Sequence, residues 1–428
     1  MTEPPTARTL LRERTFRRYW SAQTISYVGD QVTLLALPLL AVLVLKATPA
    51  QMGLLTAAGL AANLVLSLPA GVWVDRRRHR RYVMIVSDLA RALLLASIPI
   101  AYAFGHLGLV QLYAVAFGIG CFSILFDLSN ATMFVCVVPS TGFVAGNSLI
   151  NGSRAMSFVG GPALGGFLVQ LLSAPVALIA DSVSYLGSAF NLLRIRPTEP
   201  PPEHHKEGQL SAGLRFLLSS RVLWQGIVAV ATVNLFNYMF SALVILYVIT
   251  ELHVSPGLLG TIIGAASVGA LLGSVLTSPL VRAIGVGPAY VVGLIVFPLP
   301  LVLVPAAGGP RPLVLALLFL AEFLSGLGVM FLDISYGSIS AALVPARLRA
   351  RVAGTTRTLN YGIRPVGALL GGALGTAMGV RHTLWLATIG AAFGVLWLIG
   401  SPILRLRTLP EPDDAPDPAT EPDPVSAG

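Results

Sequence analysis

Residues 117–139 read FGIGCFSILFDLSNATMFVCVVP, and residues 323–345 read FLSGLGVMFLDISYGSISAALVP. The two stretches align without a gap at an offset of 206 positions and share several glycine, proline and polar residues. The matched pairs are Phe117 and Phe323, Gly120 and Gly326, Asp127 and Asp333, Ser129 and Ser335, and Pro139 and Pro345. Because the matches fall mainly at glycine, proline and aspartate, we interpret the stretches as copies of an internal repeat.

The repeat extends beyond these stretches. At the same offset the chain pairs further small and apolar residues, namely Gly161 with Gly367, Leu164 with Leu370, Gly165 with Gly371 and Gly166 with Gly372. An offset of 207 pairs Pro49 with Pro256 and Gly53 with Gly260. Two related halves in the same orientation are typical of transporters that rock about a central site.

The composition indicates a membrane protein. Of the 428 residues, 55% are hydrophobic and only 11% are charged, and the mean hydropathy is +0.79. Soluble globular chains carry roughly 25% charged residues, so an ordinary soluble enzyme and a disordered protein are both excluded. The apolar runs are continuous rather than alternating, which excludes an outer-membrane barrel.

Twelve apolar segments are long enough for helices that cross a bilayer, at 20–45, 52–74, 82–104, 108–134, 143–172, 175–193, 222–248, 257–281, 288–306, 313–339, 352–378 and 382–404. We therefore predict an all-α membrane protein of twelve transmembrane helices in two six-helix, pseudo-symmetric halves. The predicted divisions are an N-tail at 1–19, an N-terminal half at 20–193, a linker at 194–221, a C-terminal half at 222–404 and a disordered C-tail at 405–428. Within the linker, the stretch 210–218 is helix-like.

The basic residues predict the orientation. Lys and Arg concentrate in the N-tail, the even-to-odd loops and the C-tail, whereas the opposite loops carry only Lys46, Arg311 and Arg381. Positive charge favours the cytoplasmic side. We therefore expect a multi-pass protein of the cell inner (plasma) membrane with both termini cytoplasmic. The net charge of +9 fits loops that face anionic lipid rather than nucleic acid.

The sequence predicts no enzyme chemistry. The chain has only two cysteines, Cys121 and Cys136, and no metal-ligand spacing. It lacks the Gly-x-x-x-x-Gly-Lys-Ser/Thr loop that cradles ATP phosphates. We expect no catalytic residues, no metal and no cofactor, so an ion gradient or the gradient of the substrate must drive any transport.

The stretch Gly71-Val-Trp-Val-Asp75-Arg76-Arg-Arg-His-Arg80-Arg resembles the loop signature Gly-x-x-x-Asp-Arg-x-Gly-Arg-Arg/Lys of the major facilitator superfamily. Gly71 permits close helix approach. The resemblance implies a gating loop in which Asp75 faces a helix N-terminus and Arg76 pairs with a carboxylate. The second glycine of that signature is replaced by Arg78.

The fifth segment contains Gly161-Pro162-Ala-Leu-Gly165-Gly166, which is similar to the core of the antiporter motif of the same superfamily. Small residues there favour close helix packing, and Pro162 bends the helix.

The chain most resembles the drug:proton antiporter branch with twelve spans, which includes macrolide-efflux and enterobactin-export proteins. Two local phrases support this placement, namely Gly29-Asp30 ahead of Ala36-Leu37-Pro38, and Asp181-Ser-Val-Ser184-Tyr185.

Charges inside the membrane are costly and therefore indicate function. Counted at about 1.5 Å per residue, Asp30 and Glu322 fall near the membrane midplane. The resemblance implies that spans 1, 4, 7 and 10 line the central cavity, which makes both acids candidates for proton coupling or substrate binding. We expect Arg154 and Arg364 to be candidate counter-ions of these acids.

Four further acids have structural interpretations. Asp127 and Asp333 occupy matching places near the cytoplasmic ends of their spans. They are interpreted as latch residues that pair with loop arginines such as Arg76 or Arg347, with substrate contact as the alternative. Asp88 and Arg91, three apart on one helix, are interpreted as a local pair, and Asp181 as a helix-packing hydrogen bond.

The resulting hypothesis is a monomeric secondary transporter that exports a lipophilic small molecule, a drug, antibiotic or metabolite, in exchange for protons. The alternatives are an uncoupled facilitator or importer of a small metabolite and a non-transporting membrane scaffold or receptor. The expected partners are the substrate, protons and the lipid bilayer.

Overall fold

The computed structural model describes residues 6–197, 199, 210–345 and 348–409. Among these residues, ten helical stretches are long and apolar enough to span a membrane, namely α2 (Arg14–Leu43), α3 (Pro49–Asp75), α4 (Arg80–Ala103), α5 (Leu109–Val137), α6 (Phe143–Leu172), α7 (Ala174–Leu193), α9 (Arg221–Thr250), α10 (Pro256–Ile284), α11 with α12 (Val286–Val296 and Leu303–Ala306) and α13 (Arg311–Leu343). They coincide with the first ten predicted segments.

Two further helices occupy the last two predicted segments. They are α14 (Arg349–Met378) and α15 (Val380–Ala392), and the turns of η4 (Phe393–Leu398) extend α15. Arginines at four positions lower the hydropathy of α14, and α15 is only 13 residues long. The chain is therefore an all-helical membrane protein with the predicted fold, in which α14 carries four arginines and α15 is short.

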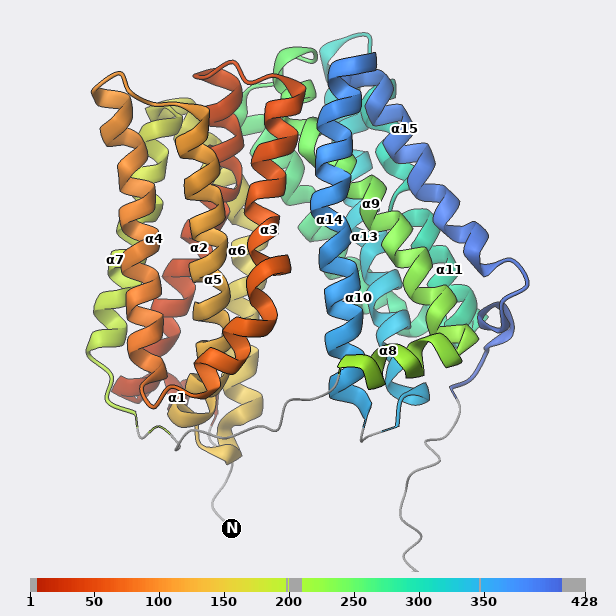
Figure 1. The fold of residues 1–428 in the computed structure, drawn as a ribbon, viewed down its shortest axis with the longest axis horizontal. Helices are drawn as coiled ribbons and strands as arrows, with labels where there is room; N and C mark the ends of the chain where they lie inside the picture. The colour runs from red at the N-terminus through yellow and green to blue at the C-terminus, as the bar shows by residue number, and fades with distance from the viewer. Residues whose placement is uncertain (1–5, 198, 200–209, 346–347, 410–428) are drawn as a thin grey trace, which may run out of the picture.

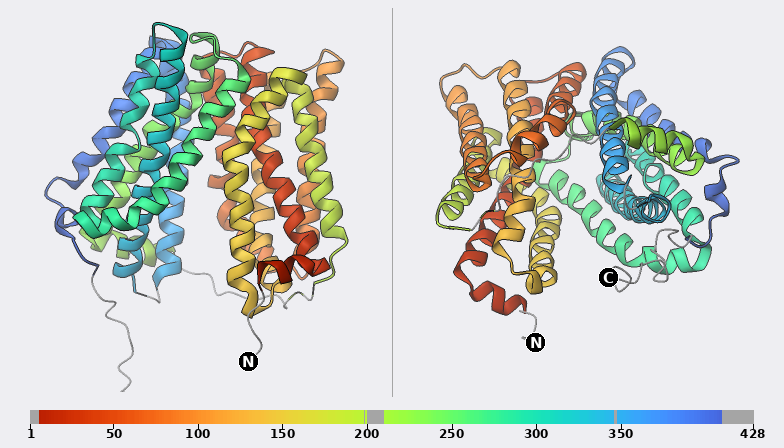
Figure 2. Two further views of the ribbon diagram at one scale, coloured as in Figure 1. Left: turned by 180° about the vertical axis from the view of Figure 1, so that it is seen from behind. Right: turned by 60° about the horizontal axis from the view of Figure 1, so that its bottom comes forward.

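Figures 1 and 2 show two bundles side by side, α2–α7 in red to yellow-green and α9–α15 in green to blue. Both ends of the described part of the chain lie at one end of the molecule, which we call the terminal face. The opposite end, where α2 turns into α3 and α9 into α10, is the distal face. The short helix α1 (Ala7–Arg12) makes part of the expected N-tail helical, and α8 (Leu210–Ser219) covers the helix-like stretch of the linker. Of the expected C-tail at 405–428, the structure describes residues 405–409, and residues 410–428 lie outside the described residues.

The two halves repeat one another at their distal turns. Thr48 caps α3 and Ser255 stands at the same place before α10, and in both helices a proline follows at the first position. The turn from α6 to α7 uses Ser173 at φ +79°, and the turn from α14 to α15 uses Gly379 at φ +89°. A positive φ is strained for serine and easy for glycine. The second half therefore makes the same sharp turn with the better-suited residue.

The apolar cores show how the halves meet. One large core contains residues from both halves, including Leu40, Met52, Leu246 and Leu259, and these lie toward the distal ends of their helices. Toward the terminal face, the larger cores stay within one half: one contains Phe16 and other N-terminal residues, and another contains only C-terminal residues. The halves are therefore joined at the distal face and separate at the terminal face.

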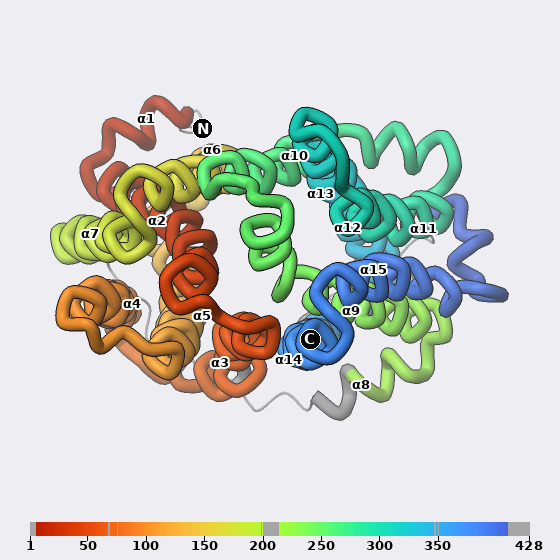
Figure 3. Tube along the Cα trace, turned by 90° about the horizontal axis from the view of Figure 1, so that it is seen from above, coloured from red at the N-terminus to blue at the C-terminus, as the bar shows by residue number. Residues whose placement is uncertain are grey.

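Two seams join the halves, one between α6 and α10 and one between α3 and α14 (Figures 1 and 3). In the α6–α10 seam, the Gly257 amide donates to Gln170 Oε1 at 3.0 Å. In the α3–α14 seam, the Ala50 amide donates to Thr376 Oγ1 at 3.1 Å. Ala50 and Gly257 are repeat equivalents, and so are Gln170 and Thr376, so one contact is built twice.

Glycines of the repeat allow the helices to approach in both seams. A Cβ at Gly166 would strike the Pro256 carbonyl, and a Cβ at Gly372 would lie 2.9 Å from the Pro49 carbonyl. Pairs of matched glycines were the main signal of the repeat in the sequence. The structure shows that these residues form the contact surfaces between the halves.

Candidate functional site

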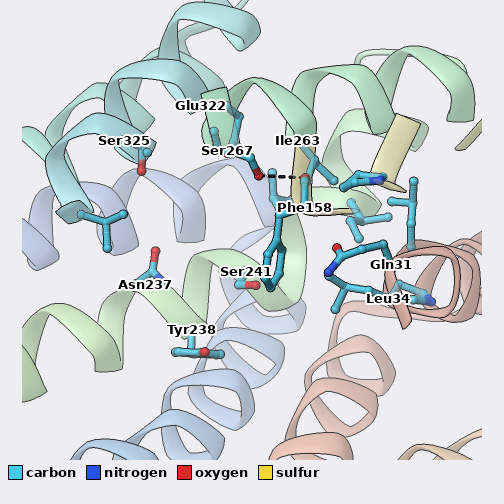
Figure 4. A pocket seen from close by; sticks show the side chains of 18 of the residues that line it. Gln31, Leu34, Phe158, Asn237, Tyr238, Ser241, Ile263, Ser267, Glu322 and Ser325 are labelled. Atoms are coloured by element: carbon cyan, nitrogen blue, oxygen red, sulfur yellow. Dashed lines mark hydrogen bonds between the residues drawn. The ribbon is translucent and has the colours of Figure 1, made fainter. Parts of the chain in front are cut away.

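A cavity of about 970 Å³ lies between the halves, beneath the distal core. It is lined by residues of α2, α3, α5, α6, α9, α10 and α13, most of them apolar. Figure 4 shows the polar exceptions, which include Gln31, Asn237, Tyr238, Ser241 and Glu322. The helices of predicted spans 1, 4, 7 and 10 all contribute, as the resemblance implied, and α3, α6 and α10 add to the wall.

Glu322 is the only residue with a formal charge among the described residues that line the cavity. It lies on α13 and is half-buried. No described residue gives it a hydrogen bond or an ion pair. An ionised carboxylate in apolar surroundings is costly without a partner. A proton or a cationic ligand would therefore neutralise it.

Asp30 differs from Glu322 because it has protein partners and does not line the cavity. The Tyr185 hydroxyl donates to Asp30 Oδ1 at 2.6 Å, and Arg91 Nη1 lies 3.7 Å from the same oxygen. The Asp30 side chain is still 39% exposed. The sequence grouped Asp30 with Glu322, but the structure places Asp30 inside the N-terminal half, one residue before the cavity wall at Gln31.

Arg91 is shared between two acids. Its Nη2 donates to Asp88 Oδ1, so the predicted local pair is present. Its Nη1 is the nitrogen that faces Asp30. The guanidinium also lies over the rings of Phe126 and Tyr185, at 4.6 and 4.2 Å from their centroids. With Arg91 2% and Asp88 0% exposed, this arginine is held rigidly in the N-terminal core.

Asp181 completes the set. It is fully buried and accepts hydrogen bonds from the Thr33 hydroxyl and, at 2.8 Å, from Ser184 Oγ. This is the predicted packing role. We call Asp30, Asp88, Asp181 and Arg91 the acidic cluster. It contains three acids and one base, so it carries excess negative charge unless protons bind.

Gly29 shows why two distant sequence phrases belong together. A Cβ at Gly29 would strike Asp181 Oδ1 and Ser184 Oγ. Residues 29–30 of α2 therefore pack directly on residues 181–185 of α7. The phrases that supported the family resemblance form the two sides of one buried contact.

We expect Gly29→Ala to destabilise the protein by about 1–3 kcal/mol, because the added methyl group overpacks this contact. The measurement is thermal unfolding of the purified protein in detergent. Gly160→Ala on α6 is the matched control, since nothing lies within 4 Å of its Cβ position. Equal melting temperatures for the two variants would show that the contact at Gly29 is loose.

Arg154 and Arg364 do not act as counter-ions in this conformation. No described acid forms an ion pair with either side chain. Arg154 lies 5.5 Å from the Phe158 ring centroid and 6.0 Å from that of Tyr27. Arg364 lies over two tyrosine rings of its surroundings. The expected pairing with Asp30 or Glu322 is not formed in this conformation, in which Arg91 of α4 lies 3.7 Å from Asp30 Oδ1.

The expected gating loop and latch are open. Arg76, Asp127 and Asp333 are exposed, and in the described part of the chain no ion pair joins the two acids to a loop arginine. The Asp75 side chain and all of Arg347 lie outside the described residues. Nothing lies within 4 Å of a Cβ position at Gly71, so the close approach expected there is absent. These findings share one cause, since the halves are apart at the terminal face.

The linker holds the start of α4, where the expected gating loop ends. Glu199 Oε2 accepts from the Arg80 amide at 2.5 Å, and Oε1 accepts from the Arg81 amide at 3.3 Å. A carboxylate at the free amides of a helix start is favourable. The Glu199 carboxylate thus joins the linker to the start of α4. The side chain of Arg80, the first residue of α4, is also buried there.

The antiporter motif packs against both halves. A Cβ at Gly161 would lie 2.5 Å from Gln31 Cβ, and one at Gly165 would lie 3.0 Å from Val32 Cα. Gly166 faces α10 instead, and the Pro162 carbonyl faces Gly260 across the seam. The small residues therefore permit the close packing that the sequence predicted, and they link the cavity helix α2 to the α6–α10 seam.

The same site has no metal-binding character in the described residues, where no group of three or more His, Cys, Asp or Glu side chains comes together. Its features are an apolar cavity between two related halves, closed at one face, and a small number of intramembrane charges. Together with the twelve-helix fold, they define a secondary transporter of the major facilitator superfamily.

Comparison with known proteins identifies the family. A family model described as transmembrane secretion effector (MFS_3) matches residues 6–426, and the chain belongs to this family of transporters. The chain is 28% identical over 396 residues to the multidrug efflux pump Tap of Mycolicibacterium fortuitum, covering 89% of this chain and 93% of the pump. It is 27% identical over 409 residues to the pump of the same name in Mycobacterium tuberculosis, covering 92% and 94%.

A solved structure supports the fold. The crystal structure of a bacterial homologue of the iron transporter ferroportin, in an inward-facing state, superposes with a TM-score of 0.74 at 16% identity. The alignment covers 90% of this chain and 98% of that one. At this identity the similarity establishes the shared architecture alone.

Proposed function

We propose that this protein exports lipophilic, preferentially cationic small molecules in exchange for protons. The observation that carries the proposal is the unpaired carboxyl of Glu322 on the wall of a mostly apolar cavity. Such a wall favours amphiphilic ligands, and the carboxylate favours positive charge. Two distant relatives are named multidrug efflux pumps, which supports export as the direction and a drug-like molecule as the substrate.

The cavity faces the cytoplasm in this conformation if the terminal face is the cytoplasmic one, as the basic loops indicate. The distal seams would then close the outward path while the separated terminal ends leave the inward path open. Transport requires the reverse arrangement as well. In it the seams part, and the terminal ends come together around Asp127, Asp333 and the gating loop.

Proton coupling follows from competition for charge. Facing inward, ionised Glu322 would favour a cation from the cytoplasm or inner leaflet. After the switch, a proton from outside would take its place and release the ligand, because a ligand and a proton that share one site exclude each other. The coupling proton then returns inward with the empty carrier.

The acidic cluster gives the N-terminal half a second place for a proton. Asp30 and Asp88 share one arginine, so one of the two acids has no full counter-charge. Protonation of such a set belongs to the group rather than to one residue. Asp30 is its accessible member, and we propose that it senses which face is open.

The test uses inverted membrane vesicles with an acidic interior and ethidium, a permanently charged cation that acid trapping cannot concentrate. We expect ethidium to accumulate inside, to leak back when nigericin collapses the pH gradient, and to accumulate several-fold less with Asp30→Asn. Equal accumulation with and without the gradient would support the uncoupled facilitator instead. If Asp30→Asn and Glu322→Gln both kept full proton-driven transport, the assignment of these acids would be wrong.

A further inference from the structure

Arg364 is an intramembrane cation to which the proposed function gives no role. It lies near the middle of α14 and is half-buried. Its guanidinium lies 4.1 Å from the ring centroid of Tyr361 and 5.1 Å from that of Tyr238. The two rings hold the group in place through cation–π contacts.

This guanidinium keeps unused hydrogen-bonding capacity. Its Nε is buried and has no hydrogen-bond partner among the described residues. Asp333 of α13 interacts with the Arg364 charge through space but forms no ion pair with it. A guanidinium offers five donors in a planar fork that fits a carboxylate. Among the described residues, the Tyr238 side chain is the one polar contact of Arg364 besides the charge of Asp333. An intramembrane arginine with donors to spare indicates a ligand.

Arg364 is not itself among the residues that line the cavity, but it lies next to one of them. Tyr238, whose ring contacts the guanidinium, lines the cavity next to Asn237 and Ser241. The internal repeat gives independent support, because the equivalent of Arg364 at the offset of 206 is Phe158, which also lines the cavity. Arg154 is a weaker candidate, since it is exposed and its nearest ring centroid lies 5.5 Å away.

The cavity thus has two poles. Figure 4 shows Glu322 on one side of the pocket and Tyr238, which leads to Arg364, on the other. We propose that Arg364 is a second ligand subsite that binds the carboxylate of a zwitterionic amphiphile whose cationic end lies at Glu322. This inference rests on the proposed function for the role of Glu322, and it narrows the substrate class from cations to zwitterions.

The test compares norfloxacin, which carries an ammonium and a carboxylate at neutral pH, with its methyl ester, which carries only the ammonium. Binding to the purified protein in detergent is followed by the fluorescence anisotropy of the two compounds. We expect the wild type to bind norfloxacin about tenfold more tightly than the ester, the effect of one charge-assisted contact. Arg364→Gln should remove this preference by lowering the affinity for norfloxacin while leaving the affinity for the ester unchanged.

Arg357→Gln is the matched control, because Arg357 is exposed and lies 5.3 Å from the same Tyr361 ring. It should leave the preference intact. Ester binding by Arg364→Gln shows that the variant is folded. Three results would overturn the proposal. They are a variant that binds neither compound, a wild type that binds both with equal affinity, and a wild type that binds neither.

The binding experiment is independent of coupling. Failure of the proposed function would appear as ethidium transport that ignores the pH gradient, whereas failure of the subsite appears as equal affinity for the acid and the ester. Glu322→Gln should lower the affinity for both compounds by the same factor, because both carry the ammonium group. Unequal weakening that spares the ester would place the cationic end elsewhere and contradict the two-pole arrangement.

Discussion

A disulfide across the α3–α14 seam is expected to stop transport completely. The Ala50 amide donates to Thr376 Oγ1 at 3.1 Å, so the two residues are in direct contact across the seam. In a background with Cys121→Ser and Cys136→Ser, Ala50→Cys with Thr376→Cys should cross-link on mild oxidation. Ethidium accumulation should then fall to that of vesicles without the protein and recover with dithiothreitol. The reason is that alternating access requires this seam to part.

The matched control is a bridge within one half. Ser97 Oγ and Gln111 Nε2 lie 3.1 Å apart between α4 and α5; since the glutamine side chain is long, Ser97→Cys and Gln111→Cys are joined by a short bifunctional thiol reagent. Because α4 and α5 move together, transport should continue. Continued transport with the Ala50–Thr376 bridge fully formed would mean that the halves do not separate at the distal face. An unchanged cellular function with that bridge would favour the scaffold alternative.

The second large effect is expected from Glu322→Gln. The amide has nearly the same shape as the carboxyl, so the cavity stays intact while its one charge is lost. We expect proton-driven ethidium accumulation to fall about tenfold or more, the cost of losing a charged contact. The measurement is the initial rate of accumulation in acid-loaded vesicles.

Glu251→Gln is the control for this change. Glu251 follows α9 at the distal face, is exposed, and should tolerate the same substitution without effect. Equal rates in the two variants would remove Glu322 from the mechanism. A loss of binding for neutral ligands as well would indicate a change in cavity shape rather than in charge.

Much of the fold was predictable because it depends on patterns that are local in the sequence. Apolar length predicted the helices, and the repeat predicted two equivalent halves. The matched residues proved to be contact residues, as Gly53 and Gly260 show in the two seams. The motif at residues 161–166 likewise predicted close packing, because Gly161 and Gly165 have no side chain and so allow α2 to approach.

The partners of the charges were not predictable in the same way. Arg91 was assigned to Asp88 alone, since spacing along one helix reports only local pairs. Its second contact, with Asp30, depends on how α2 and α4 pack. The phrase around Tyr185 carried a usable signal, because a conspicuous polar run in an apolar helix needs buried partners. Gly29 beside Asp30 marked where those partners approach.

The conformation also lay beyond the sequence. The latch expected between Asp127 or Asp333 and a loop arginine would form in one state only, and the structure shows a state in which the terminal ends are apart. The placement of Arg154 and Arg364 on aromatic rings follows from tertiary packing as well. The sequence indicated that both arginines lie inside helices, but it could not predict which residues surround them.

The most direct test of the account is whether ethidium displaces a proton from the purified protein. In lightly buffered detergent solution with a pH indicator dye, the wild type should release protons when ethidium is added, and Glu322→Gln should release none. This result would show that cation and proton compete for the Glu322 carboxyl. Ethidium binding without proton release, or equal release from Glu322→Gln, would contradict the central claim.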